Sequence, residues 1–145
     1  MAYWDTSALL KLYVAEHDSP FFVRLHASED EPVFSSAIVM TEVICALYRK
    51  EQAGDLRSGG AKAVFRKFSA DVNAGNIVTV PYGADVVKEA ENLVRLVFEQ
   101  PRPILVRSLD LIHVSSAVAV KARVIVATDT RLRKVAALAG LKALP

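Results

Sequence analysis

The sequence has a single cysteine, Cys45, so it can form no intramolecular disulfide and no zinc site built from thiolates. It has no glycine-rich phosphate loop, since neither Gly-x-Gly-x-x-Gly nor Gly-Lys-Ser/Thr occurs. Its apolar runs are all interrupted well before the roughly 20 residues that would cross a bilayer. No basic, cleavable leader opens the chain, and the prediction is therefore a cytoplasmic protein without a membrane partner.

Composition indicates a folded protein. Hydrophobic residues make up 52% and charged residues 23% of 145 residues, which is not the composition of a disordered chain. The length predicts one domain spanning residues 1–145. The net charge of +2 says little about partners. Cys45 lies in an apolar context, which favours a buried free thiol.

Short apolar runs alternate with longer helical patterns. The predicted strands are Ala2–Trp4, Val33–Phe34, Ile77–Val80, Arg123–Ala127 and Lys142–Leu144. The predicted helices are Ser7–Val14, Pro20–Ala27, Ile38–Gln52, Ala61–Ala74, Ala84–Phe98, Leu109–Lys121 and Arg131–Ala139. Ser108 is predicted to cap the helix that follows it. This alternation predicts an α/β fold with a parallel sheet covered on both faces.

Four acidic residues lie beside or inside apolar stretches of this pattern. Asp5 and Asp129 each follow a predicted strand, whereas Glu42 and Asp110 lie in predicted helices. Ligands of open α/β sheets bind at the carboxyl ends of strands, so the two strand-end positions are informative. Carboxylates that converge away from water repel one another and are costly to bury. A hard divalent cation, Mg²⁺ or Mn²⁺, would stabilise such a cluster.

Three of the four acids also have a purely structural interpretation. Asp5 and Asp129 could cap the helices that follow them, and Asp110 could serve a helix dipole. Glu42 is harder to explain in this way, because apolar residues surround it on its helix. The joint placement favours a functional site. Three hydroxyl residues beside the acids could order water or a phosphate oxygen, or could only cap: Thr6, Ser7 and Thr128.

His113 follows Asp110 by one helical turn. A metal-binding pair is possible at this spacing, but a satisfied core or interface histidine is the favoured interpretation. Basic residues near the acids fit a polyanionic substrate, or else a solvated helix face. They are Arg102, Arg107, Arg131, Arg133 and Lys134, of which Arg131 directly follows the Thr-Asp-Thr segment.

With these residues in place, the chain resembles PIN-domain ribonucleases of the VapC toxin type. The stretches that carry the resemblance are Tyr3–Tyr13, Ser35–Glu42, Arg107–His113, Val126–Leu132 and Ala139–Leu141. Each motif is weak alone, but together and in this order they are fairly specific. The segment Phe65–Val80 carries no motif of the family.

The resemblance implies a three-layer α/β/α sandwich with a five-stranded, mainly parallel sheet. It implies that Asp5, Glu42, Asp110 and Asp129 bind Mg²⁺ or Mn²⁺ and hydrolyse RNA phosphodiesters. It also implies a homodimer and a small cognate antitoxin as partner. Thr6, Ser7, Thr128 and Arg131 are then candidates for binding substrate or ordering water.

The sequence is also compatible with other functions. A haloacid-dehalogenase-type phosphatase would need an acid two residues after Asp5, where Ser7 stands. A response-regulator receiver would need an acidic pair and a late lysine, and neither is evident. A PIN nuclease of RNA maturation without an antitoxin remains an alternative. The last alternative is a catalytically silent binding module on the same fold. Loss of an acid would be its sequence signature, and all four acids are present.

Overall fold

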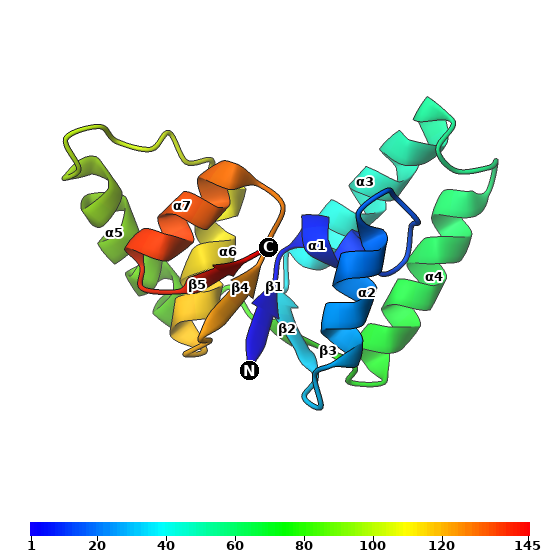
Figure 1. Cartoon of the computed structure of the whole chain (residues 1–145), viewed down its shortest axis with the longest axis horizontal. Helices are drawn as coiled ribbons and strands as arrows, with labels where there is room; N and C mark the ends of the chain where they lie inside the picture. Colours follow the sequence, from blue (N-terminus) through cyan, green and yellow to red (C-terminus); the bar gives the residue numbers. More distant parts are fainter.

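The computed structural model describes residues 1–145 as a β-sheet with helices on both faces (Figure 1). The strands are β1 (Ala2–Trp4), β2 (Val33–Ser36), β3 (Ile77–Val80), β4 (Val124–Val126) and β5 (Lys142–Leu144). The helices are α1 (Thr6–Leu10), α2 (Ser19–Ala27), α3 (Val39–Ala53), α4 (Gly60–Asn73), α5 (Ala84–Phe98), α6 (Ser108–Ala119) and α7 (Thr130–Leu138). The predicted α/β/α sandwich is confirmed.

The sheet contains five parallel strands in the order β3-β2-β1-β4-β5, with β1 at the centre. The chain adds β2 and β3 on one side of β1, and then returns to add β4 and β5 on the other. Strand order therefore reverses beside β1, where open α/β sheets form their ligand crevice. Trp4 pairs with Val126, and the Asp5 amide donates to the Val126 carbonyl at 3.0 Å. This register brings Asp5 close to the residues that follow β4.

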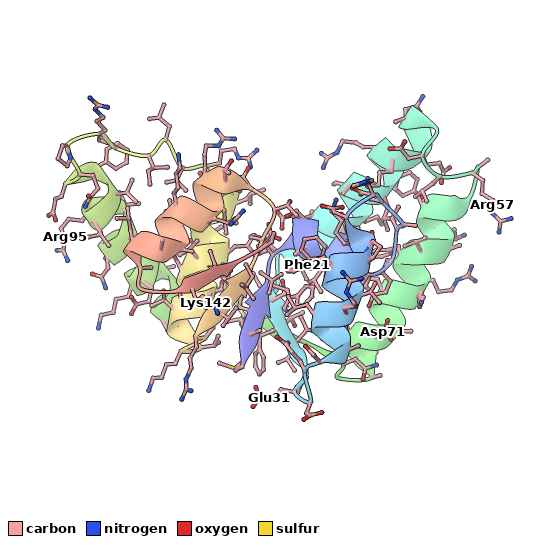
Figure 2. The ribbon with its side chains drawn as sticks, in the orientation of Figure 1. Phe21, Glu31, Arg57, Asp71, Arg95 and Lys142 are labelled. Atoms are coloured by element: carbon pink, nitrogen blue, oxygen red, sulfur yellow. The ribbon has the colours of Figure 1, made fainter.

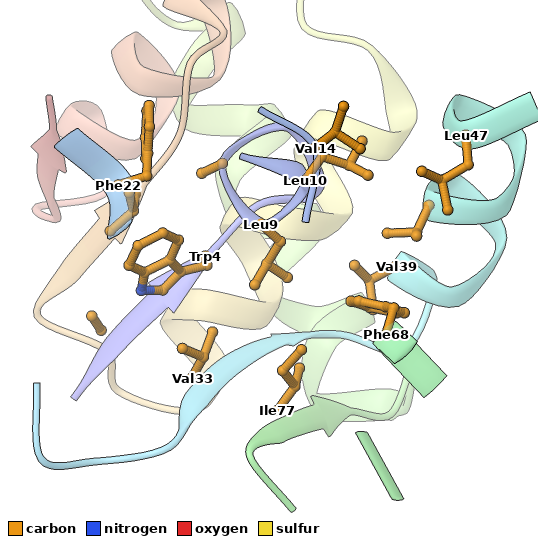
Figure 3. Close-up of a cluster of buried hydrophobic side chains, with 14 of the residues drawn as sticks. Trp4, Leu9, Leu10, Val14, Phe22, Val33, Val39, Leu47, Phe68 and Ile77 are labelled. Atoms are coloured by element: carbon orange, nitrogen blue, oxygen red, sulfur yellow. The ribbon is translucent and has the colours of Figure 1, made fainter. Parts of the chain in front are cut away.

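Alternation along β1 divides the core between the two faces of the sheet. Trp4 lies on the face covered by α1 to α4, where it packs near Phe22 and Val33 (Figure 3). Tyr3 lies on the other face, which α5, α6 and α7 cover, in a cluster with Ile125. All of β1 is buried, which explains its uninterrupted apolar sequence.

Charged side chains project outward from both helical layers. Arg57, after α3, and Arg95, on α5, point away from the sheet at opposite ends of the molecule (Figure 2). No helix has both the length and the apolar content that a membrane span requires.

Most predicted helices begin and end within two residues of the observed ones, but two predictions about helix ends are wrong. The first helix was expected to reach Val14 but ends at Leu10, and the chain continues in turns. Ser108 was expected to cap α6, but it is the first residue of that helix. The N-cap position belongs to Arg107, whose side chain makes no capping hydrogen bond. The Arg107 side chain instead contacts the carboxylates of Asp110 and Asp129.

Candidate active site

A cleft of about 880 Å³ lies at the carboxyl ends of β1 and β4. The four predicted acids all line it, and each comes from a different part of the fold. Asp5 follows β1, Glu42 lies on α3, Asp110 lies on α6, and Asp129 precedes α7. The other lining residues are Thr6, Ser7, Leu10, Thr41, Cys45, Ala46, Arg49, Arg107, Ser108, Leu109, His113, Thr128 and Thr130.

Asp5 is buried at the junction of β1 and α1, with only 5% of its surface exposed. Its Oδ1 accepts a hydrogen bond from the Ala8 amide at 2.8 Å, which caps α1. The Ser7 hydroxyl lies 2.8 Å from each carboxylate oxygen. Burial raises the pKa of Asp5 above its ordinary value, and nearby His113 and these hydrogen bonds offset only part of the effect. Asp5 is thus both a helix cap and a cleft-lining acid.

Glu42 reaches the cleft from the first turn of α3. Its Oε2 accepts a hydrogen bond from the Thr6 hydroxyl and lies 2.7 Å from His113 Nε2. Burial alone would raise the pKa of Glu42, but His113, Thr6 and the charge of Arg107 together hold it below its ordinary value. Glu42 is therefore a partly buried carboxylate that stays ionised at neutral pH.

Arg107 lies between Asp110 and Asp129. Its Nε is 2.8 Å from Asp110 Oδ2, and its Nη2 is 3.2 Å from Asp110 Oδ1 and 3.1 Å from Asp129 Oδ2. These contacts with Asp110, and the charge of Asp129, raise the pKa of Arg107. A guanidinium that bridges two carboxylates neutralises part of the acidic cluster.

Asp129 carries a second set of contacts at the start of α7. Its Oδ1 accepts hydrogen bonds from the Arg131 and Leu132 amides at 2.8 and 3.1 Å. Burial works to raise the pKa of Asp129, but these amides and the nearby arginines lower it below its ordinary value. Like Asp5, Asp129 caps a helix while its side chain lines the cleft.

The predicted hydroxyl residues hold the acids in place. Thr6 donates to Glu42, and Ser7 donates to Asp5. Thr128 Oγ1 donates to Ser7 Oγ at 2.6 Å, which supports Ser7 from the far side. Sequence spacing placed these three groups beside the acids, but it did not show which acid each one contacts.

Arg131 is exposed and lies outside the lining of the cleft. Its backbone amide contacts Asp129, whereas its Nη2 is 4.0 Å from Asp129 Oδ2. The guanidinium is therefore a looser neighbour of the acids than that of Arg107.

Sequence reasoning missed three features of the cleft. Arg107 was treated only as a basic neighbour, although its spacing of three residues before Asp110 was a usable signal. His113 is a satisfied buried histidine, as favoured, but its partner is the cleft acid Glu42. The prediction that Cys45 is buried is wrong, because Cys45 is exposed and lines the cleft.

The donor set has the chemistry that a hard divalent cation requires, because carboxylate oxygens are the protein ligands that Mg²⁺ and Mn²⁺ prefer. Arg107 already places a positive charge against two of the acids. In this arrangement no three His, Cys, Asp or Glu side chains are grouped to hold one ion. To bind one ion, these carboxylates would have to shift toward one another, in competition with the contacts of Arg107 with Asp110 and Asp129.

Residues 2–138 match the PIN domain family, and the chain belongs to this family. The fold is similar to VapBC2 from Rickettsia felis bound to a DNA fragment from their promoter, with 14% identity, a TM-score of 0.68, and 99% of this chain and 98% of that chain covered. It is also similar to VapBC-1 from nontypeable Haemophilus influenzae, with 13% identity, a TM-score of 0.67, and coverage of 99% and 97%. The comparison with curated proteins found no match.

Proposed function

We propose that this PIN-domain protein is a metal-dependent endoribonuclease and the toxin of a toxin–antitoxin pair. The observation that carries the proposal is the set of four carboxylates, from four parts of the fold, that line one cleft beside the central strand. Two of them, Asp5 and Asp110, are buried, and their burial has a cost that a bound cation would offset. Membership of the PIN domain family supports a nuclease.

The proposed ion ligands are Asp5, Glu42, Asp110 and Asp129. A divalent cation at this position supplies Lewis-acid activation of water and neutralises charge on the phosphodiester. The residues of the chain prepare the site for it. Ser7 and the Ala8 amide orient Asp5, and the amides at the start of α7 orient Asp129. A carboxylate that is not fully used in binding the ion, Asp110 or Asp129, is the candidate to orient the attacking water by accepting its hydrogen bond.

Cationic side chains beside the acids suit a polyanionic substrate. Arg49 and Arg107 line the cleft, and Arg131 lies at its edge. When Arg107 leaves the carboxylates, its guanidinium is placed near the reacting phosphate and can bind its oxygens with two N–H groups. Arg49 and Arg131 then contact neighbouring phosphates of the RNA, which is a salt-dependent contribution to affinity.

The proposed partners are a second copy of the chain and a small antitoxin. Both similar structures named above are VapBC assemblies. An arginine or lysine of an antitoxin would fit among the acids in the way that Arg107 does here, through charge-assisted hydrogen bonds. The exposed face of α3 contributes to the homodimer in this proposal, and Tyr48 on it is 54% exposed.

Cleavage of RNA tests the enzymatic part of the proposal. The purified protein is incubated with total RNA in Mg²⁺, in Mn²⁺ and in excess chelator, and the cut sites are mapped. Cleavage is expected with either ion, none with chelator, and none for Asp5→Asn. Full activity in excess chelator, or in Asp5→Asn, would exclude the metal-dependent mechanism.

Co-expression with the small protein encoded beside this chain tests the toxin assignment. Co-purification with loss of ribonuclease activity supports a toxin, and light scattering of the free chain checks the dimer against the 15.8 kDa monomer. An active nuclease that no neighbouring protein inhibits would favour the alternative role in RNA maturation. A chain that binds the partner but cuts no RNA under any condition would favour a silent binding module.

A further inference from the structure

His113 is a buried titratable group of the cleft to which the proposed function gives no task. It lies on α6, one turn after Asp110, and only 2% of its surface is exposed. Its Nδ1 is 2.8 Å from the Tyr3 hydroxyl, and its Nε2 is 2.7 Å from Glu42 Oε2. The imidazole therefore connects the buried central strand to an acid of the cleft.

The direction of these two hydrogen bonds follows from Tyr3. The Tyr3 side chain is fully buried, and a tyrosine phenol is protonated at neutral pH. We therefore assign its hydroxyl as the donor of the hydrogen bond to His113 Nδ1. An imidazole that accepts at Nδ1 carries its proton on Nε2, where it donates to Glu42. The Glu42 carboxylate thus accepts a hydrogen bond from an imidazole that is itself held by buried Tyr3.

Both hydrogen bonds of the Glu42 carboxylate use the same oxygen. Oε2 accepts from His113 Nε2 and from Thr6 Oγ1, which belong to α6 and α1. No hydrogen bond of the protein engages Oε1. Fixing one oxygen from two sides stops rotation of the carboxylate and leaves the lone pairs of the other for a ligand.

We propose that His113 is a positioning residue that holds Glu42 so that Oε1 alone binds the divalent cation. This inference rests on the proposed function, because it assumes that the acids hold an ion. Thr6 is the second donor in the same arrangement, and Tyr3 sets the imidazole proton. Hydrogen bonds to the outer oxygen of a ligating carboxylate orient it, and their loss typically weakens metal binding by about 10–100-fold.

A purely structural role for His113 predicts something different. In that case the ring matters for packing, and its edge contact with Tyr3, at 5.9 Å between ring centroids, is the important interaction. The chain offers a matched control in His26, whose ring makes a similar contact with Trp4 at 6.1 Å and lies outside the cleft. Loss of packing would act on stability, and it would not depend on a hydrogen-bond donor at position 113.

The experiment measures Mn²⁺ affinity by calorimetric titration of the full chain, together with melting temperature. His113→Leu removes the donor, and His113→Gln keeps an N–H donor near the position of Nε2. His113→Leu is expected to weaken Mn²⁺ binding by about 10–100-fold, His113→Gln to recover most of the affinity, and His26→Leu to leave it unchanged. Cleavage by His113→Leu should recover at high Mn²⁺, so that the metal requirement changes more than the maximal rate.

Thr6 provides a second pair if His113→Leu does not fold. Thr6→Val should weaken Mn²⁺ binding, and Thr6→Ser, which keeps the hydroxyl, should restore it. Equal losses in the Leu and Gln variants, or wild-type affinity in His113→Leu and Thr6→Val, would overturn the positioning role. Failure of the wild-type protein to bind Mn²⁺ or cut RNA is a separate result, and it would remove the proposed function itself.

Discussion

Replacement of Arg107 by alanine should destabilise the metal-free protein and tighten its binding of divalent cations. Exposed ion pairs contribute about 0.2–1 kcal/mol, whereas breaking a buried pair costs about 3–5 kcal/mol. The Arg107 side chain is 58% exposed and that of Asp110 only 11%, so the interaction falls between these limits. Solvent screens the exposed guanidinium, so the free energy of this interaction should lie nearer the limit for exposed pairs. We expect about 1–2 kcal/mol.

This free energy has two measurable consequences. Without metal, Arg107→Ala should lower the melting temperature by roughly 2–8 °C, given about 2–4 °C per kcal/mol for a chain of this size. With metal, the ion no longer has to displace a guanidinium from Asp110 and Asp129. The variant should then bind Mn²⁺ about 5–30-fold more tightly, which is the same 1–2 kcal/mol expressed as an affinity.

The assay is thermal unfolding in chelator and across an Mn²⁺ titration, followed by circular dichroism. Arg107→Lys should be intermediate, because an ammonium lacks the fork that contacts both acids. Arg131→Ala is the matched control, since its guanidinium is 4.0 Å from Asp129 and makes no bidentate contact. If both alanine variants changed Mn²⁺ affinity equally, a general charge effect would replace direct competition by Arg107.

Three further predictions follow from other parts of the structure. Asp5→Asn should raise the melting temperature in chelator, because burial raises the pKa of Asp5 and makes its ionised form costly in the folded protein. For the same reason, the contribution of Asp5 to wild-type stability is full at low pH and is lost as pH rises through its folded pKa. Denaturation at several pH values should show this loss in the wild type and not in the variant. Glu16 has the opposite pH dependence, because hydrogen bonds from Lys11 and Lys50 lower its pKa. Its contribution to stability is present above the unfolded-state pKa of about 4.3 and is lost as pH falls through the folded-state pKa. Glu16→Gln should therefore reduce the loss of unfolding free energy at acid pH, and an unchanged dependence of that free energy on pH would contradict this. Trp4→Ala should cost about 3–5 kcal/mol in denaturant unfolding, because the indole projects from the central strand and is fully buried. A cost below about 1 kcal/mol would be inconsistent with that packing.

The sequence by itself determined the class of fold and the positions of the acids. Uninterrupted apolar runs such as Ala2–Trp4 are typical of strands buried on both faces, and the 3.6-residue period between them predicts helices. The acids Asp5 and Asp129 were informative because a residue that follows a parallel strand must lie at one edge of the sheet. Local patterns carry this information, since period and strand direction are properties of neighbouring residues.

The tertiary structure alone decided which side chains meet across the cleft. Arg107 joins Asp129, and His113 joins Glu42, over 22 and 71 residues of chain. Cys45 is exposed for a related reason: its side of α3 borders the cleft, although its neighbours in sequence are apolar. Such contacts depend on strand order and on the face of the sheet that each helix covers. The sequence pattern does not reveal that face, because a helix has the same hydrophobic periodicity on either side of the sheet. The pairing of charges in this site is therefore a property of the packed sheet and helices, which no single segment encodes.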